Sequence, residues 1–216
     1  MSLAQTLWNE NADLAAAALE HPFVLGIGDG SLPREAFAAY IAQDAFFLDG
    51  FARAYALALA HSPDRESRDS FAELLTGVRE ELRLHDRYAA RWGIDLERVQ
   101  PTQTTSAYLD FLLDRASLAG VGLTCAAMTP CMRLYAHLGH SLAGRTAEPY
   151  TEWVQTYADP AFRQLVATLE QLLDQHATDV HDTQTTYRRA MELELAFFDE
   201  ALADPRSNMT TTRPPD

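Results

Sequence analysis

The chain has 216 residues, 47% of them hydrophobic, and a net charge of −14 from 31 acidic and 17 basic residues. Every basic residue is an arginine and none belongs to a basic tract. Nucleic acid and anionic membrane surfaces are therefore disfavoured as partners, because attraction to phosphate would have the wrong sign. No apolar run reaches the length of a membrane span, and the N-terminus has neither the basic region nor the apolar core of a signal peptide. We expect a cytoplasmic protein.

The residue pattern predicts an all-α fold, because Ala, Leu, Glu and Gln dominate and no alternating β-branched runs occur. A first helix is predicted from Leu3 to Leu19, with Asn11 as the one polar residue on its apolar face. The stretch from Glu20 to Pro33 is rich in Gly and Pro, which is typical of a connecting loop.

A second helix is predicted from Arg34 to His61, and its apolar stripe contains a carboxylate. Asp44 lies in the middle of that stripe, whereas Asp49 falls on the solvent face. Burying an unpaired carboxylate costs several kcal/mol or raises its pKa. Asp44 therefore needs either a structural partner or a ligand. The stripe consists of Phe37, Tyr40, Ile41, Phe47, Leu48, Phe51 and Tyr55.

A third helix is predicted from Arg65 to Trp92, with a short charged interruption at residues 79–81. Glu81 and His85 lie one turn apart in it, a spacing that allows a shared metal ion, although a surface hydrogen bond is the commoner outcome. A loop then leads to Pro101, and polar residues at 102–106 cap a fourth helix that carries Tyr108.

Cys131 and Tyr135 lie on one face of the next helix, one turn apart. Pro130 either occupies the first turn of a new helix capped by Thr129 or interrupts a longer helix that begins near residue 118. Both arrangements favour a reactive thiolate at Cys131, although a lone cysteine on an apolar helix is more often a small buried hydrophobe. Cys125 faces another side and lies beyond disulfide reach, so both thiols are expected to be reduced.

Three further helices are predicted at 150–157, from Pro160 to His176, and at 183–203. The last of these carries Glu194 among apolar residues, so a second carboxylate faces the interior. Because the predicted connections are short, we expect one helical domain over residues 1–204, followed by a disordered tail at 205–216.

The inward-facing polar groups form a possible site if the bundle brings their helices together. A thiol could add to an electron-poor carbon while one carboxylate orients the substrate and another delivers a proton. Aromatic walls from Phe47, Tyr108 and Tyr135 would suit a heteroaromatic ring. The candidate polar groups are Asp44, Tyr108, Cys131, Tyr135 and Glu194.

The chain resembles the TenA family, also called thiaminase II or aminopyrimidine aminohydrolase, over nearly its whole length. The resemblance implies a helical bundle of the heme-oxygenase-like type. It rests on five groups of motifs that occur in the family's order: His21-Pro22-Phe23 with Gly30-Ser31-Leu32-Pro33, Tyr40-Ile41-Ala42-Gln43-Asp44, Pro130-Cys131 with Tyr135, Trp153-Val154-Gln155-Thr156-Tyr157, and Glu194-Leu195-Ala196-Phe197-Phe198-Asp199.

The resemblance implies hydrolysis of 4-amino-5-aminomethyl-2-methylpyrimidine to its 5-hydroxymethyl form in thiamin salvage, and it allows thiamin cleavage. It implies Cys131 as the nucleophile and Glu194 as the proton donor, with Tyr108 supporting the thiol. Asp44, Tyr135 and Tyr157 would contact the substrate. No metal or other cofactor is implied, and the expected assembly is a homotetramer.

Four positions depart from the family's usual residues. Phe47 replaces a common tyrosine that is thought to help activate the cysteine, so weaker activity is expected. Arg133, Thr129 and Phe198 replace an aromatic residue, a leucine and a tryptophan, which puts the substrate preference in doubt.

Two other functions remain open at this point. One is a di-iron oxygenase on the same bundle, with Glu81, His85, His176, Asp179 and His181 as a poorly spaced ligand set. The other is a helical protein that binds a heterocycle without turning it over.

Overall fold

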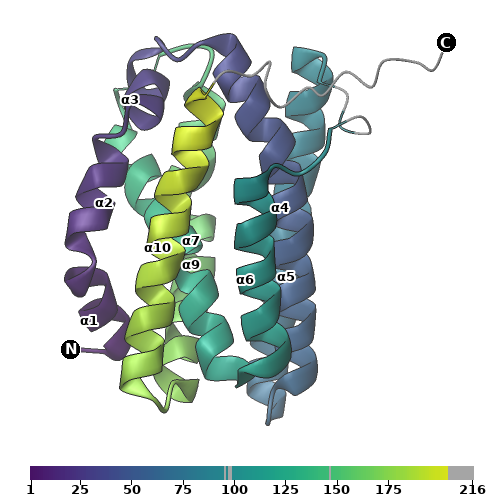
Figure 1. The fold of residues 1–216 in the computed structure, drawn as a ribbon, viewed down its shortest axis with the longest axis vertical. Helices are drawn as coiled ribbons and strands as arrows, with labels where there is room; N and C mark the ends of the chain where they lie inside the picture. The colour runs from purple at the N-terminus through teal and green to yellow at the C-terminus, as the bar shows by residue number, and fades with distance from the viewer. Residues whose placement is uncertain (95, 97–98, 146, 204–216) are drawn as a thin grey trace, which may run out of the picture.

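The computed structural model describes residues 1–94, 96, 99–145 and 147–203. Across these residues every regular element is a helix, which confirms the all-α prediction (Figure 1). The helices are α1 (Leu3–Glu10), α2 (Ala12–Leu19), α3 (Pro22–Asp29), α4 (Arg34–His61), α5 (Arg65–Trp92), α6 (Gln103–Leu118), α7 (Gly120–Leu142), α8 (Thr151–Ala158), α9 (Pro160–His176) and α10 (Val180–Leu202).

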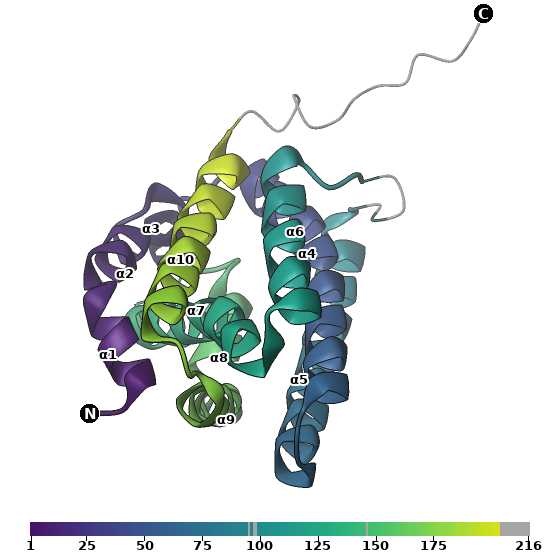
Figure 2. The same cartoon turned by 60° about the horizontal axis from the view of Figure 1, so that its bottom comes forward.

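Two groups of helices meet in the middle of the bundle. The long α4 packs against α5 and α6, while α7 packs against α8, α9 and α10. The short α1, α2 and α3 lie together at the side of α10 that is remote from α5, as both ribbon views show (Figures 1 and 2). The helices surround one interior, and the predicted site residues lie on the inward faces of α4, α6, α7, α8 and α10.

Several helix boundaries follow from capping residues that the sequence displays. Asp64 and Thr102 accept hydrogen bonds from backbone N–H groups three residues on, at the starts of α5 and α6. Asp159 caps α9, whose first position is Pro160. These side chains satisfy N–H groups that have no partner within the helix, so each start is fixed locally.

The predicted first helix is in fact two helices separated at Asn11. The Asn11 side chain donates to the Leu7 carbonyl at 2.8 Å, and its backbone has left helical geometry at ψ 21°. Asparagine competes with the backbone for hydrogen bonds in this way. The chain can therefore change direction there, and α2 packs against α10.

The predicted connector at 20–33 contains α3, so that prediction was wrong. His21 caps the helix and Pro22 occupies its first position, while Gly30 ends it with φ 80°. The two internal glycines allow close packing: a Cβ at Gly26 would lie 3.0 Å from Leu32, and one at Gly28 would lie 2.9 Å from Leu142. Neighbouring elements thus stabilise a helix that composition disfavours.

Two predictions about helix continuity are resolved. The charged residues at 79–81 do not interrupt α5, which is unbroken. Pro130 lies inside α7, so the longer-helix alternative is confirmed, with its start at Gly120. Thr129 beside it donates its hydroxyl to the Cys125 carbonyl at 2.7 Å.

The placement of residues 1–204 in one domain stays a prediction, and the tail predicted at 205–216 lies outside the described residues.

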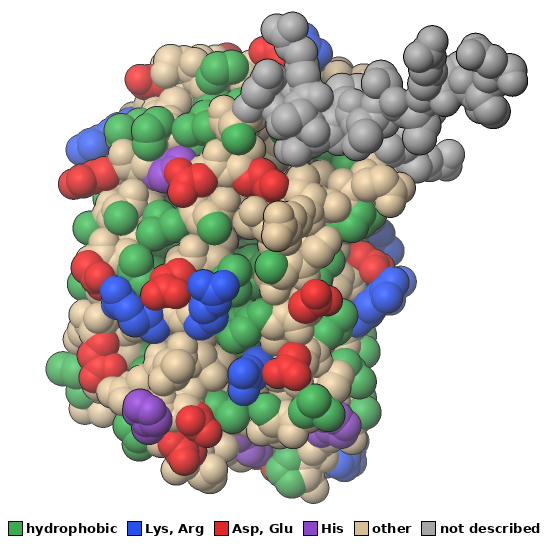
Figure 3. All heavy atoms as spheres, viewed as in Figure 1, with side chains coloured by type: hydrophobic (Ala, Val, Ile, Leu, Met, Phe, Trp, Pro, Cys, Tyr) green, Lys and Arg blue, Asp and Glu red, His purple; other side chains and the backbone are tan. Residues whose placement is uncertain are grey.

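The surface seen in Figure 3 mixes acidic, basic and apolar side chains, with no large area of one kind. Large exposed apolar side chains are scattered over several helices, as at Leu25, Leu118 and Val180. Among the described residues, no helix combines the length and hydropathy that a membrane crossing requires.

Candidate active site

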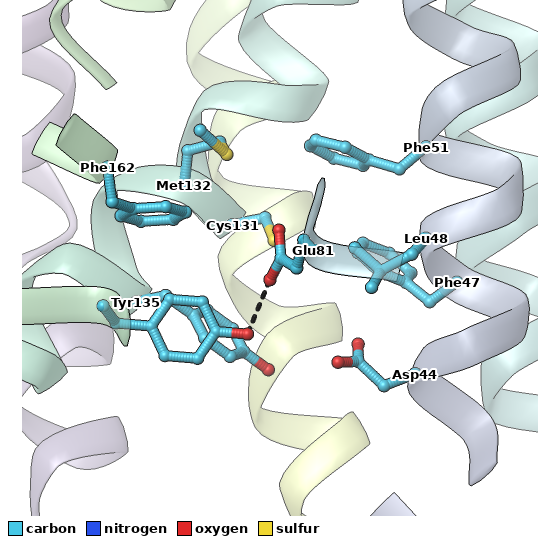
Figure 4. A pocket seen from close by; sticks show the side chains of 10 residues that line it. Asp44, Phe47, Leu48, Phe51, Glu81, Cys131, Met132, Tyr135 and Phe162 are labelled. Carbon is cyan, nitrogen blue, oxygen red and sulfur yellow. Dashed lines mark hydrogen bonds between the residues drawn. The ribbon is translucent and has the colours of Figure 1, made fainter. Parts of the chain in front are cut away.

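A small pocket opens between the two groups of helices, and Figure 4 shows its wall at close range. Five helices contribute to it, which explains why no single segment of the sequence defines the site. The lining residues are Asp44, Phe47, Leu48 and Phe51 from α4, Glu81 from α5, Cys131, Met132 and Tyr135 from α7, Tyr157 from α8, and Phe162 from α9.

Cys131 lines this pocket, whereas Cys125 is fully buried and does not. Burial raises the pKa of the Cys131 thiol well above its usual range, and the Glu194, Glu81 and Asp44 carboxyls raise it further. The expectation of a stabilised thiolate was therefore wrong. The thiol sits inside α7 beside carboxyl groups, and both its burial and those carboxyls disfavour the ionised form.

Glu194 lies behind the thiol, outside the pocket lining, with 2% of its surface exposed. Tyr108 donates its hydroxyl to Glu194 Oε1 at 2.6 Å. Burial raises the pKa of Glu194 to about 7, against the opposing effect of hydrogen bonds with Tyr108 and Cys131. This carboxyl can therefore accept and return a proton near neutral pH. Tyr108 holds the carboxyl in place. The sequence suggested that its ring would form a wall of the pocket, but Tyr108 is not among the lining residues.

Asp44 has the structural partner that its burial requires. Its Oδ2 lies 2.5 Å from Nε2 of His85, and Nδ1 of the same ring lies 3.0 Å from the Glu81 carbonyl oxygen. Burial alone would lower the pKa of His85, but the charge and hydrogen bond of Asp44 raise it to about 9. Both ring nitrogens face oxygen acceptors, so the ring is held as an imidazolium.

Glu81 places a third carboxyl in the pocket. Tyr157 donates its hydroxyl to Glu81 Oε1 at 2.6 Å. Burial raises the pKa of Glu81 to about 7, while the nearby His85 lowers it and Asp44 raises it. Figure 4 shows this carboxyl at the centre of the pocket, beside Cys131 and above Asp44.

Aromatic rings form much of the remaining wall. Tyr135 and Tyr157 meet edge to face with centroids 4.8 Å apart. Trp153 donates to the Tyr40 hydroxyl, which donates in turn to the Tyr135 hydroxyl, each at 3.3 Å. The hydrogen of Tyr135 is thereby left for a ligand. Phe47 lines the pocket with a ring that offers no hydroxyl.

The structure brings all seven predicted site residues together. Asp44, Phe47, Cys131, Tyr135 and Tyr157 line the pocket, and Glu194 with Tyr108 stand directly behind it.

Sequence reasoning missed the roles of Glu81 and His85 in this pocket. A signal was present, since Leu74, Val78 and Tyr88 lie with them on one stripe of α5 at helical spacing. The polar pair interrupts that buried stripe just as Asp44 interrupts the stripe of α4.

The residues of the di-iron alternative do not assemble into a ligand set. Glu81 is bonded to Tyr157, and His176 Nε2 lies 2.8 Å from the Ser67 hydroxyl. In the part of the chain that the structure describes, no group of three or more His, Cys, Asp and Glu side chains could hold a metal ion.

Comparisons with known proteins identify the family of the chain. A family model described as the TENA/THI-4/PQQC family matches residues 8–204. A protein of Halalkalibacterium halodurans named aminopyrimidine aminohydrolase is 34% identical, over 93% of this chain and 96% of that protein.

Solved structures extend the likeness to the fold. A protein of Silicibacter sp. TM1040, described as a TenA family transcription regulator, superposes with a TM-score of 0.88 at 26% identity, over 93% of this chain and 96% of that one. A heme oxygenase of Synechocystis sp. PCC6803 gives a TM-score of 0.64 at 15% identity, over 96% and 95% of the two chains. The predicted heme-oxygenase-like bundle is thereby confirmed.

Proposed function

Because this chain belongs to the TENA/THI-4/PQQC family, we propose that it is an aminopyrimidine aminohydrolase of thiamin salvage. It hydrolyses 4-amino-5-aminomethyl-2-methylpyrimidine to the 5-hydroxymethyl compound, a C–N bond hydrolysis, and thiamin itself is a second possible substrate of the thiaminase II type. The support is the relative that carries this name at 34% identity over almost the entire chain.

The observation that supports this reaction is that the Cys131 thiol lies close to a buried carboxyl group that can accept and donate a proton. Cys131 faces the pocket, and the carboxyl of Glu194, which acts on the thiol from outside the pocket lining, has a pKa of about 7. The thiol is protonated at rest, so it needs a base at the moment of attack. Glu194 takes that proton as the sulfur adds to an electron-poor ring carbon, and then gives it to the adjacent ring nitrogen, where charge develops.

The groups that orient the substrate are already held in place by hydrogen bonds before the substrate binds. The Asp44 carboxylate, held by His85, accepts hydrogen bonds from the amino edge of the pyrimidine. The Tyr135 hydroxyl donates a further hydrogen bond, and its ring, with those of Tyr157 and Phe47, packs against the flat heterocycle. Because the network behind these residues is already formed, little freedom is lost on binding.

Phe47 lines the pocket without the hydroxyl that a tyrosine would supply at this position. In the proposed site, a tyrosine there would add a donor beside the thiol, so Phe47→Tyr is expected to raise kcat several-fold without changing the fold. Steady-state rates of wild type and variant, with circular dichroism as the control for folding, give the answer. An unchanged or lower kcat in a folded variant contradicts a role for that hydroxyl in this protein.

The proposal also places the protein in the cytoplasm as a homotetramer. Both cysteines are free thiols, in keeping with a reducing compartment. Light scattering coupled to gel filtration measures the assembly directly: a mass about four times the 24.0 kDa of the chain supports the tetramer, and the mass of a single chain contradicts it.

A further inference from the structure

Glu81 is a carboxyl group inside the pocket that the thiol addition does not use. It comes from α5, whereas Glu194 comes from α10 and does not line the pocket. Tyr157 fixes its Oε1 atom at 2.6 Å. Within the described residues, Oε2 makes no hydrogen bond and stays available to a ligand in the pocket.

The three carboxyl groups around the thiol differ in the side chains that they already contact. Asp44 is paired with the imidazolium of His85 at 2.5 Å. Glu194 is 2% exposed and is held by Tyr108 behind the pocket wall. Only Glu81 of these three lines the pocket without a cation in direct contact. Of these three carboxyl groups, Glu81 is therefore the one available in the pocket to contact a positively charged substituent of a bound substrate.

The titratable groups facing Glu81 come from four helices: His85 on α5, Asp44 on α4, Cys131 on α7 and Tyr157 on α8. Burial and Asp44 raise the pKa of Glu81 toward 7, and the charge of His85 and the Tyr157 hydrogen bond oppose that rise. Both protonation states are accessible near neutral pH, which a group that cycles between base and acid requires.

We propose that Glu81 binds the leaving amino group of the substrate and then deprotonates the water that replaces it. This inference rests on the proposed function, because it assigns the second half of that reaction. After the sulfur has added and the ring nitrogen is protonated, the exocyclic C–N bond breaks. The electron pair of that bond leaves with the nitrogen of the bound ammonium group, as ammonia.

Water then attacks the exocyclic carbon that the amine has left. The water oxygen forms a bond to this carbon, and one water proton passes to Glu81. The C–S bond next breaks and restores the aromatic ring, while the ring proton returns to Glu194 and then to the Cys131 sulfur. Glu81 passes its proton to ammonia, so the products are the hydroxymethylpyrimidine and an ammonium ion.

The test compares Glu81→Gln with Glu80→Gln, using the aminomethylpyrimidine as substrate. Glu80 is the adjacent residue on α5, is exposed, and pairs with Arg83 on the surface. We expect Glu81→Gln to lower kcat about 100-fold, the usual reach of a general base, and Glu80→Gln to match wild type. Sodium azide should restore ammonia release by Glu81→Gln and give an azidomethylpyrimidine, because the azide anion has no proton to lose.

Two results overturn the assignment of Glu81 while leaving the proposed function intact. One is an unchanged kcat in Glu81→Gln. The other is a loss of kcat that azide does not restore, because azide cannot compensate for a structural defect in a folded variant. A wild-type protein that releases no ammonia contradicts the proposed function itself and the Glu81 assignment with it.

Discussion

Asp44 connects stability with recognition at the scale of a single residue. Its carboxylate and the His85 ring are both almost fully buried and lie 2.5 Å apart. Removing one partner of such a pair leaves an uncompensated charge in the interior. The same carboxylate is the one that the proposed function uses to bind the amino edge of the substrate, so one substitution should affect both properties.

We predict that Asp44→Asn lowers the free energy of unfolding by on the order of 3 kcal/mol and raises KM. Urea denaturation measures the first effect and steady-state kinetics the second. Asp49→Asn is the matched control, since Asp49 is on the same helix, exposed, and paired only with Arg53 on the surface. Its effect should stay within about 0.5 kcal/mol. Equal losses of stability in the two variants would contradict the importance of the buried pair.

Glu194 is expected to act on the rate and not on binding. A protonated carboxyl near the ring nitrogen stabilises the transition state more than the bound substrate. Glu194→Gln should therefore lower kcat about 100-fold or more with KM nearly unchanged, because the amide keeps a hydrogen bond but transfers no proton. The reverse pattern, with Glu194→Gln changing only KM and Asp44→Asn destroying kcat, would show that the two roles are exchanged.

Much of this site was predictable from helical periodicity, for a physical reason. Asp44, Cys131 and Glu194 interrupt or join apolar stripes, and a polar group on such a stripe must face the interior. The partner of each group was not predictable. His85 lies 41 positions from Asp44 along the chain, and only the packing of α4 against α5 brings the two together. The protonated state of Cys131 likewise depends on carboxyls from three other helices.

At the scale of elements, the position of Tyr157 depends on how closely α8 approaches α7. Gly139 is the contact point: a Cβ there would lie 2.5 Å from the backbone carbonyl carbon of Tyr157 and 2.7 Å from the Ala158 nitrogen. Gly122, near the other end of α7, has a similar role, since its Cβ would lie 2.3 Å from the His176 carbonyl oxygen. Backbone atoms cannot move aside as a side chain can.

We predict that Gly139→Ala and Gly122→Ala each destabilise the fold by about 1–3 kcal/mol through overpacking. Only Gly139→Ala should also raise KM, because it displaces the helix that carries Tyr157 into the pocket. Denaturant titration and steady-state kinetics on both variants separate the effects. An equal rise of KM in Gly122→Ala would mean that the kinetic change reflects general loss of stability.

The sequence predicted the long helices better than the short ones. The starts of α5, α6 and α9 carry capping side chains that act within one turn, so local rules suffice. The errors fell where tertiary contacts outweigh local propensity. Gly26 and Gly28 favour a loop by composition, yet they lie in a helix that packs closely on Leu32 and Leu142.

At the scale of the whole molecule, the buried site makes stability depend on pH. The pKa of Glu81 and that of Glu194 are both about 7 in the folded protein, above the usual 4.5. A carboxyl with a raised folded pKa contributes stability below its unfolded pKa, and this contribution is lost as pH rises through the folded value. His85, raised to about 9, loses its contribution between about pH 6.5 and 9.

We predict that Tm falls between pH 5 and pH 8.5 less steeply in Glu194→Gln than in wild type. The amide imitates the neutral acid, so the variant lacks the cost of ionising a buried carboxyl above pH 7. The difference between the two proteins cancels the contributions of other titrating groups. Calorimetry at a series of pH values measures it, and a variant with the same slope as wild type would contradict the raised pKa of Glu194.

The Cys131 thiol, as the nucleophile of an aminopyrimidine hydrolase, is the group on which every other proposed role in the pocket depends. The most direct measurement is ammonia release from 4-amino-5-aminomethyl-2-methylpyrimidine by wild type, Cys131→Ser and Cys125→Ser. Either substitution should cost only about 1 kcal/mol of stability, so all three proteins should fold. We expect no detectable turnover by Cys131→Ser and nearly wild-type turnover by Cys125→Ser, whose side chain lies outside the pocket. Full activity in folded Cys131→Ser would contradict the role of Cys131 as nucleophile. Binding of the pyrimidine by wild type without any ammonia release would contradict the proposed hydrolase function.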